Sequence, residues 1–566
     1  MMVGLVFCNV WSSRNRGLLQ YDGVGTSRYF LFQYLPQLLA ILIIIPILII
    51  QSAVQRTLPF TIMASGRSTQ NSGILHGLAL FPTNFLIPNL AFFKYKEPLL
   101  GLCYMIFWLS LFTVPLQSSF FQTRYYSFDG QNVWRWTAVQ PVGWTLLGLY
   151  LLLAVALLFL LLRFSRRNTG LRWDSKSLAD VLVLLHRSNI LSDFAGSEVQ
   201  RTSRRAYASK KYRLGYWTTS GRSDEAFHSV GEANAPDHGY ALARGGKAKA
   251  TYGSADPENF DLEGQRPIQV SRLDSLQTDI HSPAVRYRWT PWFLRDTFVV
   301  AWIVIAVVLM IAFVVVSLVN HAVENGFLPL LPSPTTTEGF SPANFLYSFL
   351  PSLLGMILFL VWQPIDLYFR ALQPFASLSD LRGTTAENCL LLDYTSRLPV
   401  EVTIKAALAG HYKVAWISFI SLLSITLPVL SGGVFTAQFF MATEEVRIAA
   451  SMPGYEALVF FAVVYALSFL VIWPTRKRYL PHDISTLGQL ISFIYQSPLL
   501  KDDAFQQPRT RVDLVTRLLG PSRGEHSSPK YAFGVYVGND GTEHLGIDRL
   551  QRPGSGEMLI TTGTMR

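Results

Sequence analysis

The stretch "VGWTLLGLYLLLAVALLFLLL" at residues 142–162 contains no Asp, Glu, Lys, Arg or His, and neither does "TFVVAWIVIAVVLMIAFVVVSLVN" at residues 297–320. An apolar helix of about 20 residues is long enough to cross a hydrocarbon core of about 30 Å. Both stretches therefore predict transmembrane helices, and they decide the fold class of the chain.

Five other apolar stretches predict the same kind of helix. The seven expected spans are Phe30–Ile50, Leu99–Leu116, Val142–Leu162, Thr297–Asn320, Phe345–Ile365, Val414–Leu430 and Met452–Pro474. Of the 566 residues, 50% are hydrophobic and only 15% are charged, where soluble domains carry about 25% charged residues. This composition excludes a single soluble globule, a fibre and a wholly disordered chain. We expect an all-α integral membrane bundle.

The positive charges predict how the bundle is oriented. The segments 51–98, 163–296, 366–413 and 475–566 hold 42 of the 48 lysine and arginine residues. Loops rich in lysine and arginine stay on the cytoplasmic side. We therefore expect the amino terminus outside and the carboxyl terminus in the cytosol. The membrane is expected to be that of the secretory pathway or the plasma membrane. The net charge of +11 then predicts attraction to the anionic cytoplasmic leaflet, and no motif supports nucleic-acid binding.

Self-comparison indicates two copies of one unit arranged in parallel. Pro36 and Pro59 match Pro351 and Pro374 at an offset of 315 residues. Gly66, Asn71, Pro82 and Tyr95-Lys96 match Gly383, Asn388, Pro399 and Tyr412-Lys413 at an offset of 317, and Pro115 matches Pro428. Anchors at nearly constant offsets are the sequence signature of an internal repeat.

The match resumes behind the third and seventh spans. "WDSKSLADVLVLLHRSNILSD" from Trp173 pairs with "HDISTLGQLISFIYQSPLLKD" from His482, and each copy has helical apolar spacing behind a plausible capping box. Alternating residues around Asn539-Asp540-Gly541 predict a β-hairpin. Each unit is thus expected to send a helix and a hairpin into the cytosol.

These patterns give a domain scheme for the whole chain. We expect an extracytoplasmic segment at 1–29, a first three-span unit at 30–164, a cytosolic helix and hairpin at 165–231, a flexible linker at 232–285, a second four-span unit at 297–474 and a cytosolic helix and hairpin at 475–566.

The repeat bears on two segments of the first unit. Ile74–Phe93 corresponds to Leu391–Gly410, which carries Asp393, Arg397, Glu401 and Lys405, so both are expected to be cytoplasmic or interfacial connections and not spans. The span at 297–320 has no counterpart ahead of the first unit, and shifting it back by 315 residues puts its end near residue 5. This predicts that the chain lacks one amino-terminal span.

The segment "SFLPSLLGMILFLVWQPIDLYFRALQPFASLSDLRGTTAENCLLLDY", with its weaker copy from Tyr34, resembles the fungal membrane family catalogued as domain of unknown function 3433. The most specific part is Gly383–Tyr394, and the terminal "YAFGVYVGNDGTEHLGIDR" is also similar to that family. The resemblance implies a multi-pass membrane protein with two such domains. It implies no activity. The first copy has Asn71-Ser72-Gly73-Ile74 in place of the acidic core around Glu387.

The sequence contains few residues in patterns that indicate catalysis or metal binding. Three distant cysteines provide neither a disulfide framework nor zinc-site spacing, and we find no phosphate loop, zincin motif or serine-nucleophile elbow. We predict no catalytic residue, no cofactor and no metal ligand. The acidic group Asp366, Asp380, Glu387 and Asp393 is expected to form caps and solvated ion pairs. The repeat-signature residues, of structural or functional role, are Pro36, Pro59, Asn71, Pro115, Pro351, Pro374, Glu387, Asn388, Asp393 and Pro428.

Three functions fit these observations. The sequence favours a non-enzymatic membrane scaffold or organiser that binds cytosolic protein partners through its two modules. A transporter or channel with a path between the units is the alternative, although the spans lack the central ionisable residues that ion pathways use. A membrane-embedded enzyme acting on lipid or glycan substrates is the third.

Overall fold

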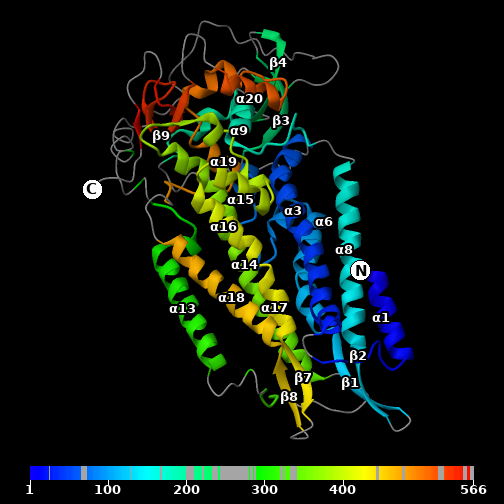
Figure 1. Cartoon of the computed structure of the whole chain (residues 1–566). Coiled ribbons are helices and arrows are strands. Elements are labelled where there is room, and N and C mark those ends of the chain that lie inside the picture. The colour runs from blue at the N-terminus through cyan, green and yellow to red at the C-terminus, as the bar shows by residue number, and fades with distance from the viewer. Residues whose placement is uncertain are drawn as a thin grey trace.

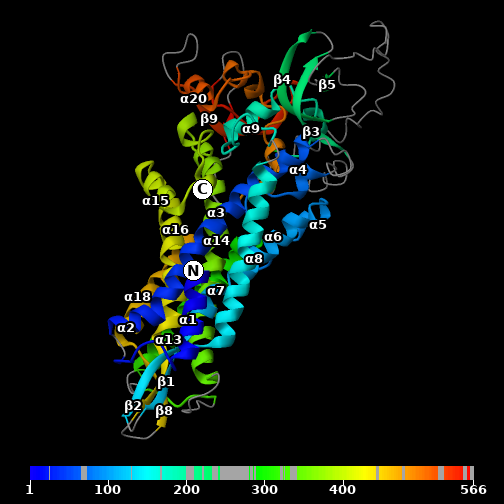
Figure 2. The same cartoon turned by 90° about the vertical axis from the view of Figure 1, so that its right-hand side faces the viewer.

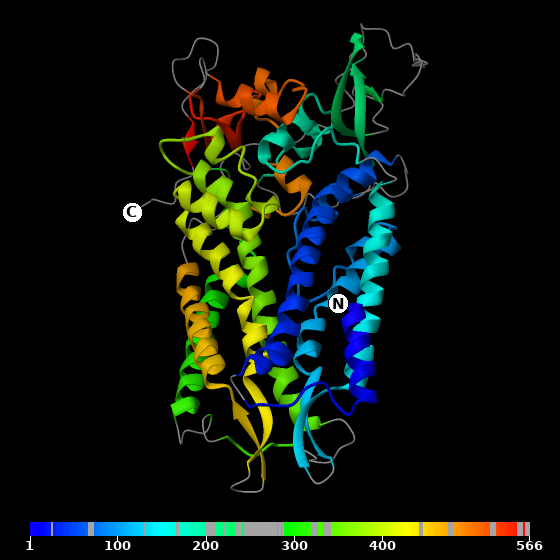
Figure 3. The ribbon, with the colours of Figure 1, turned by 45° about the vertical axis from the view of Figure 1, so that its right-hand side comes forward.

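Seven long apolar helices form the bundle at the centre of the fold. The computed structural model describes residues 1–23, 26–65, 73–128, 131–165, 169–198, 210–219, 222–232, 240–242, 280, 285, 288–318, 323, 326–331, 341–440, 445–473, 479–520, 528–551 and 558–560. The helices that are long and apolar enough to cross a membrane are Ser27–Ala64, Pro98–Ser118, Gln140–Ser165, Asp296–Val315, Pro342–Leu378, Tyr412–Val434 and Met452–Ile472. The seven predicted apolar helices are therefore confirmed (Figures 1 and 3).

The two halves of the bundle contain the same elements in the same order. The first half has a long helix, α2 (Ser27–Tyr29), η1 (Phe30–Tyr34) and α3 (Leu35–Ala64), then a broken helix, α6 (Pro98–Ser110) and α7 (Thr113–Ser118), and then α8 (Gln140–Ser165). The second half has α14 (Pro342–Leu378), then α16 (Tyr412–Leu423) and α17 (Thr426–Val434), and then α18 (Met452–Ser468) with η8 (Phe469–Ile472). Helix α13 (Asp296–Leu318), preceded by η4 (Trp292–Leu294), packs on α18.

Each half also carries a two-stranded antiparallel hairpin at the end of the bundle that lies lowest in Figure 3. Strand β1 (Phe121–Phe128) pairs with β2 (Gln131–Ala138), and β7 (Phe435–Phe440) pairs with β8 (Glu445–Ala450). The prediction of an all-helical bundle misses these hairpins. Their strands are aromatic-rich and short, and the neighbouring apolar helices conceal their period-2 pattern. We call this end the hairpin side.

The helices α3 and α14 extend well past the predicted spans, which end at Ile50 and Ile365. Each continues through internal prolines, Pro46 and Pro59 in α3 and Pro351, Pro364 and Pro374 in α14. The extensions are stabilised because other parts of the chain cover them. Phe60 and Phe375, for example, are buried. Span prediction stops where polar residues begin, whereas a helix end is set by packing.

The opposite end of the bundle carries two small modules (Figures 1 and 3). The first module contains α9 (Leu178–Leu185), η2 (Leu191–Phe194) and a sheet of β3 (Tyr212–Thr219), β4 (Arg222–Glu232) and β5 (Tyr240–Leu242) in the order β4-β3-β5. The second module contains α19 (Leu487–Ile491), η10 (Pro498–Lys501), η11 (Asp503–Phe505), α20 (Arg511–Leu519) and the strands β9 (Lys530–Val537), β10 (Glu543–Arg549) and β11 (Leu559–Ile560). These strands form a sheet in the order β10-β9-β11, and β6 (Thr384–Thr385) of the second half of the bundle also pairs with β9.

The predicted helix and hairpin are present in both modules. Ser177 with Asp180, and Thr486 with Gln489, each form the complete capping box that the sequence predicts. The hairpin around Asn539-Asp540-Gly541 is the β9–β10 pair. The predicted linker at 232–285 lies outside the described residues apart from Glu232, β5, Ile280 and Val285.

The connection Ile74–Phe93 is not a spanning helix, as the repeat predicts. It contains two single-turn helices, α4 (Ile74–Gly77) and α5 (Ala91–Lys94), separated by bends. The corresponding part of the second half contains β6 (Thr384–Thr385), η6 (Ala386–Asn388), η7 (Tyr394–Ser396) and a regular helix, α15 (Pro399–Leu408). The two halves therefore differ most in this connection.

An amino-terminal helix, α1 (Met2–Arg14), lies against α8. The Gln140 Nε2 donates to the Asn9 carbonyl at 2.8 Å, and the Ala138 N–H donates to Ser12 Oγ at 3.0 Å. Asn9 occupies the space beside Gly143, where a Cβ would meet the Asn9 amide at 2.3 Å. The domain scheme predicts no helix within residues 1–29, so α1 is an addition to it. Helix α1 packs on α8 of the first half, and α13 packs on α18 of the second half.

Helices meet through small residues and bare backbone, both within the second half and between the halves. Within the second half, the Ser352 hydroxyl of α14 donates to the Pro428 carbonyl of α17 at 2.9 Å. Between the halves, the Ser118 hydroxyl of α7 donates to the Ser348 carbonyl of α14 at 2.9 Å, and Gln33 Nε2 of η1 donates to the Gly432 carbonyl of α17 at 3.2 Å. A Cβ on Gly355 would lie 2.7 Å from the Pro428 backbone. Small residues at such crossings let helix backbones approach closely.

Replacing Gly355 by valine is expected to force α14 away from α17, because the backbone of Pro428 cannot rotate out of the way as a side chain can. We expect a loss of about 1–3 kcal/mol, the usual cost of overpacking, seen as a lower thermal unfolding midpoint of the purified protein in detergent. Gly148→Val in α8 is the control, because a Cβ there meets no atom within 4 Å. Equal losses in both variants would contradict the close contact.

Candidate functional site

The structure scatters most of the repeat-signature residues instead of gathering them. Five of the prolines are buried within helices and Pro351 is half-buried; the buried ones are Pro36, Pro59, Pro115, Pro374 and Pro428. Glu387 and Asn388 are exposed on η6. Asn71 lies outside the described residues. These residues shape helices and turns, and they do not form one site.

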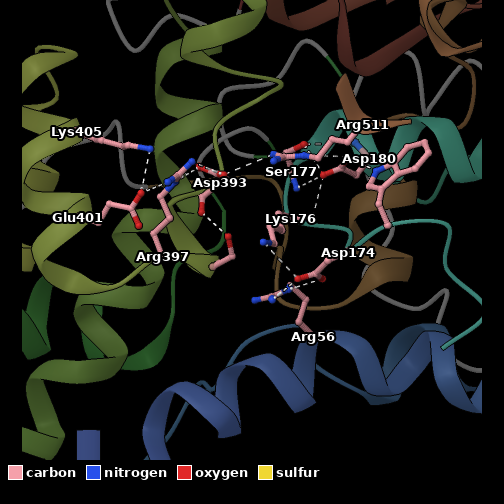
Figure 4. Close-up of polar contacts among 12 residues, drawn as sticks. Arg56, Asp174, Lys176, Ser177, Asp180, Asp393, Arg397, Glu401, Lys405 and Arg511 are labelled. Carbon is pink, nitrogen blue, oxygen red and sulfur yellow. Dashed lines mark hydrogen bonds and ion pairs between the residues drawn. The ribbon is translucent and has the colours of Figure 1, made fainter. Parts of the chain in front are cut away.

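Asp393 is the exception, because it lies in a network of charged groups between the bundle and the modules (Figure 4). Its carboxylate accepts from Arg397, whose Nη2 lies 2.8 Å from Oδ2. Arg397 also pairs with Glu401, which pairs in turn with Lys405 at 3.0 Å. This ladder runs from the segment before α15 along the first turns of that helix.

Arg511 connects this ladder to both modules. It begins α20 of the second module, and its Nη2 lies 3.5 Å from Asp393 Oδ2. Its Nε lies 3.7 Å from Oδ1 of Asp180, which belongs to α9 of the first module. One guanidinium therefore lies between carboxylates of the second half of the bundle and of the first module.

Asp180 is held rigidly in position for this contact. Its Oδ2 accepts from the backbone N–H groups of Lys176 and Ser177, each at 2.9 Å, and its Oδ1 accepts from Trp173 Nε1 at 2.8 Å. A buried carboxylate requires such partners, because an unpaired charge away from water is costly. The capping box thus orients α9 and also fixes one end of the network.

A further ion pair fastens the first module to the first half of the bundle. Arg56 on α3 donates from Nε to Asp174 Oδ1 at 3.0 Å and from Nη2 to Asp174 Oδ2 at 2.6 Å. Two parallel bonds of this kind fix orientation as well as distance. Arg56 reaches Asp174 because α3 continues past its apolar part.

The two modules also contact each other directly through a buried histidine. His544 on β10 lies with Nδ1 3.1 Å from Glu198 Oε1 and 3.0 Å from the Tyr495 hydroxyl, while its Nε2 lies 3.0 Å from Asp540. The Tyr495 hydroxyl donates to Glu198 Oε1 at 3.1 Å and accepts from the Gly196 N–H. Glu198 and Gly196 belong to the first module, so we call these residues the histidine clasp.

The clasp changes the acid–base behaviour of His544. Burial acts to lower the pKa of His544, but the hydrogen bonds and charges of Glu198 and Asp540 outweigh burial and raise the pKa above its ordinary value. His482 shows the reverse case in the same module, because burial lowers its pKa to about 4. Asp540 is close to His544 in the sequence, but Glu198 lies more than 300 residues away, so only the fold brings it to His544.

The expectation of solvated ion pairs is wrong for Asp366. Asp366 and Arg370 pair within α14, and each side chain is only 2% exposed. The Ser418 hydroxyl donates to Asp366 Oδ1 at 2.7 Å, and Arg370 Nη1 donates to the Arg397 carbonyl at 3.1 Å. The pair is buried because α14 continues past Ile365 and α16 packs against it.

The comparisons with known proteins agree with this division into halves. The model of the family described as "Protein of unknown function (DUF3433)" matches residues 30–122 and 345–436. The chain carries two copies of this domain. The first DUF3433 match runs from η1 into β1 and the second from within α14 into β7, so the predicted resemblance is confirmed. Neither the curated proteins nor the solved structures contain a match.

The DUF3433 description carries no activity, and the polar groups between the copies favour a structural role. Among the described residues, no group of three or more His, Cys, Asp or Glu side chains could hold a metal ion. The cavity beside the network, lined in part by Arg56, Lys176 and Arg370, measures about 80 Å³. Its arginines are already paired with carboxylates. The network is therefore suited to hold elements together.

Raising the pH is expected to loosen the histidine clasp. Because the folded-state pKa of His544 is raised, its contribution to stability is fully present below the unfolded pKa of about 6.5 and is lost as the pH rises through the folded value. We expect amide hydrogen exchange in 193–198 and 543–547 to increase over this window, after correction for the intrinsic rate. His544→Asn should remove this dependence, whereas His482→Asn should keep it. A pH-independent exchange in the unsubstituted protein would contradict the clasp.

Proposed function

We propose that this chain is an integral membrane protein with seven transmembrane helices that organises protein partners on a platform formed by its two modules, without an enzymatic activity of its own. The observation that carries the proposal is the continuous polar contact from α3 and α15 through Arg511 to both modules. Such a contact fixes the modules relative to the bundle and so presents one rigid surface.

Membrane insertion is supported by the outer surfaces of the helices. Large apolar side chains are exposed along α8 and α13, among them Leu151, Leu158, Val304 and Val308. Contiguous exposed apolar surface of this kind marks a membrane or an interface. The positive charge on the module side supports the proposed orientation, in which both modules lie in the cytosol next to an anionic leaflet.

The parallel arrangement of the two units is part of the same proposal. In Figure 3, α3 and α14 both rise from the hairpin side to the module side. Both matched segments begin near the hairpin side and return to it at β1 and β7. Two units that insert in the same direction place both modules on one side of the membrane, which a shared platform requires.

Transport is the second candidate, and one observation favours it. The junction between the halves buries polar atoms, including Gln37 Oε1 and Ser348 Oγ, without hydrogen-bond partners among the described residues. Polar side chains that face a bundle interior can line a path. The close contact of the halves at Gly432 argues against an open path there, because a Cβ on Gly432 would lie 2.6 Å from Gln37 Oε1 and 2.7 Å from Ser118 Cβ.

Glycosylation mapping tests the orientation. A sequon inserted at residues 441–444, between β7 and β8, is expected to gain a glycan that endoglycosidase removes, because the hairpin side faces the lumen. The same sequon inserted at residues 521–527, between α20 and β9, should gain none. Modification only at the second position would reverse the orientation, and would place the platform on the luminal side.

The scaffold function is tested by opening the platform without disturbing the bundle. We expect Arg511→Glu to place a negative charge beside Asp180 and Asp393 and to separate the modules. With a biotin ligase fused to the carboxyl terminus, the labelled neighbours of the full-length protein should change in this variant. The exposed Arg509→Glu, two residues away, is the matched control.

Two outcomes would overturn the scaffold proposal. Identical neighbours for Arg511→Glu and for the unsubstituted protein would show that the platform does not select partners. Solute or ion flux through proteoliposomes that contain only the purified protein would favour transport instead. A change confined to Arg511→Glu, with no flux, supports the scaffold.

A further inference from the structure

A cavity of about 350 Å³ lies in the first DUF3433 copy, apart from the polar network. It is bounded by α3 at Gln51 and Gln55, by the bent segment between α4 and α5, and by α6 at Tyr104 and Trp108. In Figure 2, α5 and α6 project from the side of the bundle below the level of the modules.

The lining of this cavity is polar but uncharged. No Asp, Glu, Lys, Arg or His is among the residues that line it, whereas four amide side chains are: Gln51, Gln55, Asn84 and Asn89. A phosphate or carboxylate would be poorly accommodated, because a charge needs a paired partner when it leaves water. The lining therefore selects an uncharged ligand that exchanges hydrogen bonds.

Hydrogen bonds to the bent segment hold the cavity open. Gln55 Nε2 donates to the Phe81 carbonyl at 3.2 Å, and Trp108 Nε1 donates to the Leu86 carbonyl at 2.8 Å. Asn84 Oδ1 and Asn89 Oδ1 accept from backbone N–H groups two residues on. Each asparagine keeps its amide NH₂ group for another acceptor. The bent segment is thus held in place by hydrogen bonds, and the asparagine NH₂ groups are further donors for a bound molecule.

The rim of the cavity is apolar and exposed. Ile87 and Leu90, which also line the cavity, are 64% and 55% exposed. Leu99, Leu102 and Met105 continue this exposed surface along α6. Irregular backbone of this kind is stable at the membrane interface and not within the hydrocarbon, so the rim fits the boundary between headgroups and chains.

The second copy lacks this arrangement. The segment at an offset of 317 residues contains the regular helix α15 and the ion-pair ladder from Asp393 to Lys405. Pro82 corresponds to Pro399, which begins α15, but Pro88 lies where α15 has Lys405, and proline disrupts a helix interior. The cavity is therefore a property of the first copy, formed where the charged helix is replaced.

We propose that this cavity binds the headgroup of an uncharged two-chain lipid that carries hydroxyl or amide groups, of the diacylglycerol or ceramide kind. The headgroup exchanges hydrogen bonds with the amide side chains, and the chains lie along the apolar surface of α6. The inference rests on the membrane insertion proposed above and is independent of the scaffold role.

The test is photolabelling of the full-length protein in lipid nanodiscs with photoactivatable diacylglycerol and ceramide. We expect crosslinks within residues 77–111 that unlabelled diacylglycerol or ceramide competes away, and weak labelling there by phosphatidylserine or phosphatidylcholine probes. Ala91→Trp fills the cavity from α5 and should lower this labelling about tenfold, which corresponds to about 1.4 kcal/mol of binding free energy. Ala91→Leu is a smaller filling variant if the tryptophan prevents folding.

Leu408→Trp is the matched control, because Leu408 lies at the offset of 317 residues on α15 and is 84% exposed. It should leave the labelling unchanged. Equal labelling by the charged and uncharged probes, or labelling that Ala91→Trp and Ala91→Leu leave intact, would overturn the lipid site. Alkaline carbonate extraction separates the two proposals: a protein that resists extraction but is not labelled refutes only the lipid site.

Discussion

The contact between α14 and α17 at Gly355 is the constraint on which the remaining structure depends. Because backbone meets backbone there, with 2.7 Å between a hypothetical Cβ and Pro428, the two helices have little freedom to separate. α14 also receives the Ser118 hydroxyl of α7 through its Ser348 carbonyl. The position of the first half is thus set by the same stretch of α14 that holds α17.

Because α14 is long, the same helix that contacts α17 also reaches the module side of the bundle. The helix spans 37 residues, and its far end buries Asp366 and Arg370 beside α16. The Arg370 guanidinium also donates to the Arg397 carbonyl, and Arg397 holds Asp393 for Arg511. A buried pair that loses one partner is strongly destabilising. The platform is therefore coupled to the bundle through α14.

The sequence alone predicts the long apolar helices and the capping boxes at helix starts, and the structure contains both. The spans near 142–162 and 297–320 and the capping boxes at Ser177 and Thr486 depend on residues close in the chain. The continuation of α3 to Ala64, the burial of Asp366 and the contact of His544 with Glu198 depend on segments far away. Periodicity carries no information on such contacts. Asp393 belongs to the acidic group that the sequence indicates in the second copy, but its contact with Arg511 required the fold.

The difference between the two copies bears on how such a protein gains function. Both copies keep the same long helix, broken helix and hairpin, so the connection between the first two helices is free to diverge without loss of the bundle. In the second copy this connection is charged, and it contacts both modules through Arg511. In the first copy, residues 74–93 contain no Asp, Glu, Lys or Arg, and part of this stretch bounds a cavity at the side of the bundle. Because the polar network needs carboxylates at only one of the two positions, the other copy can exchange its ion pairs for the lipid site proposed above. In this proposal, one copy fixes the modules and the other contacts the membrane.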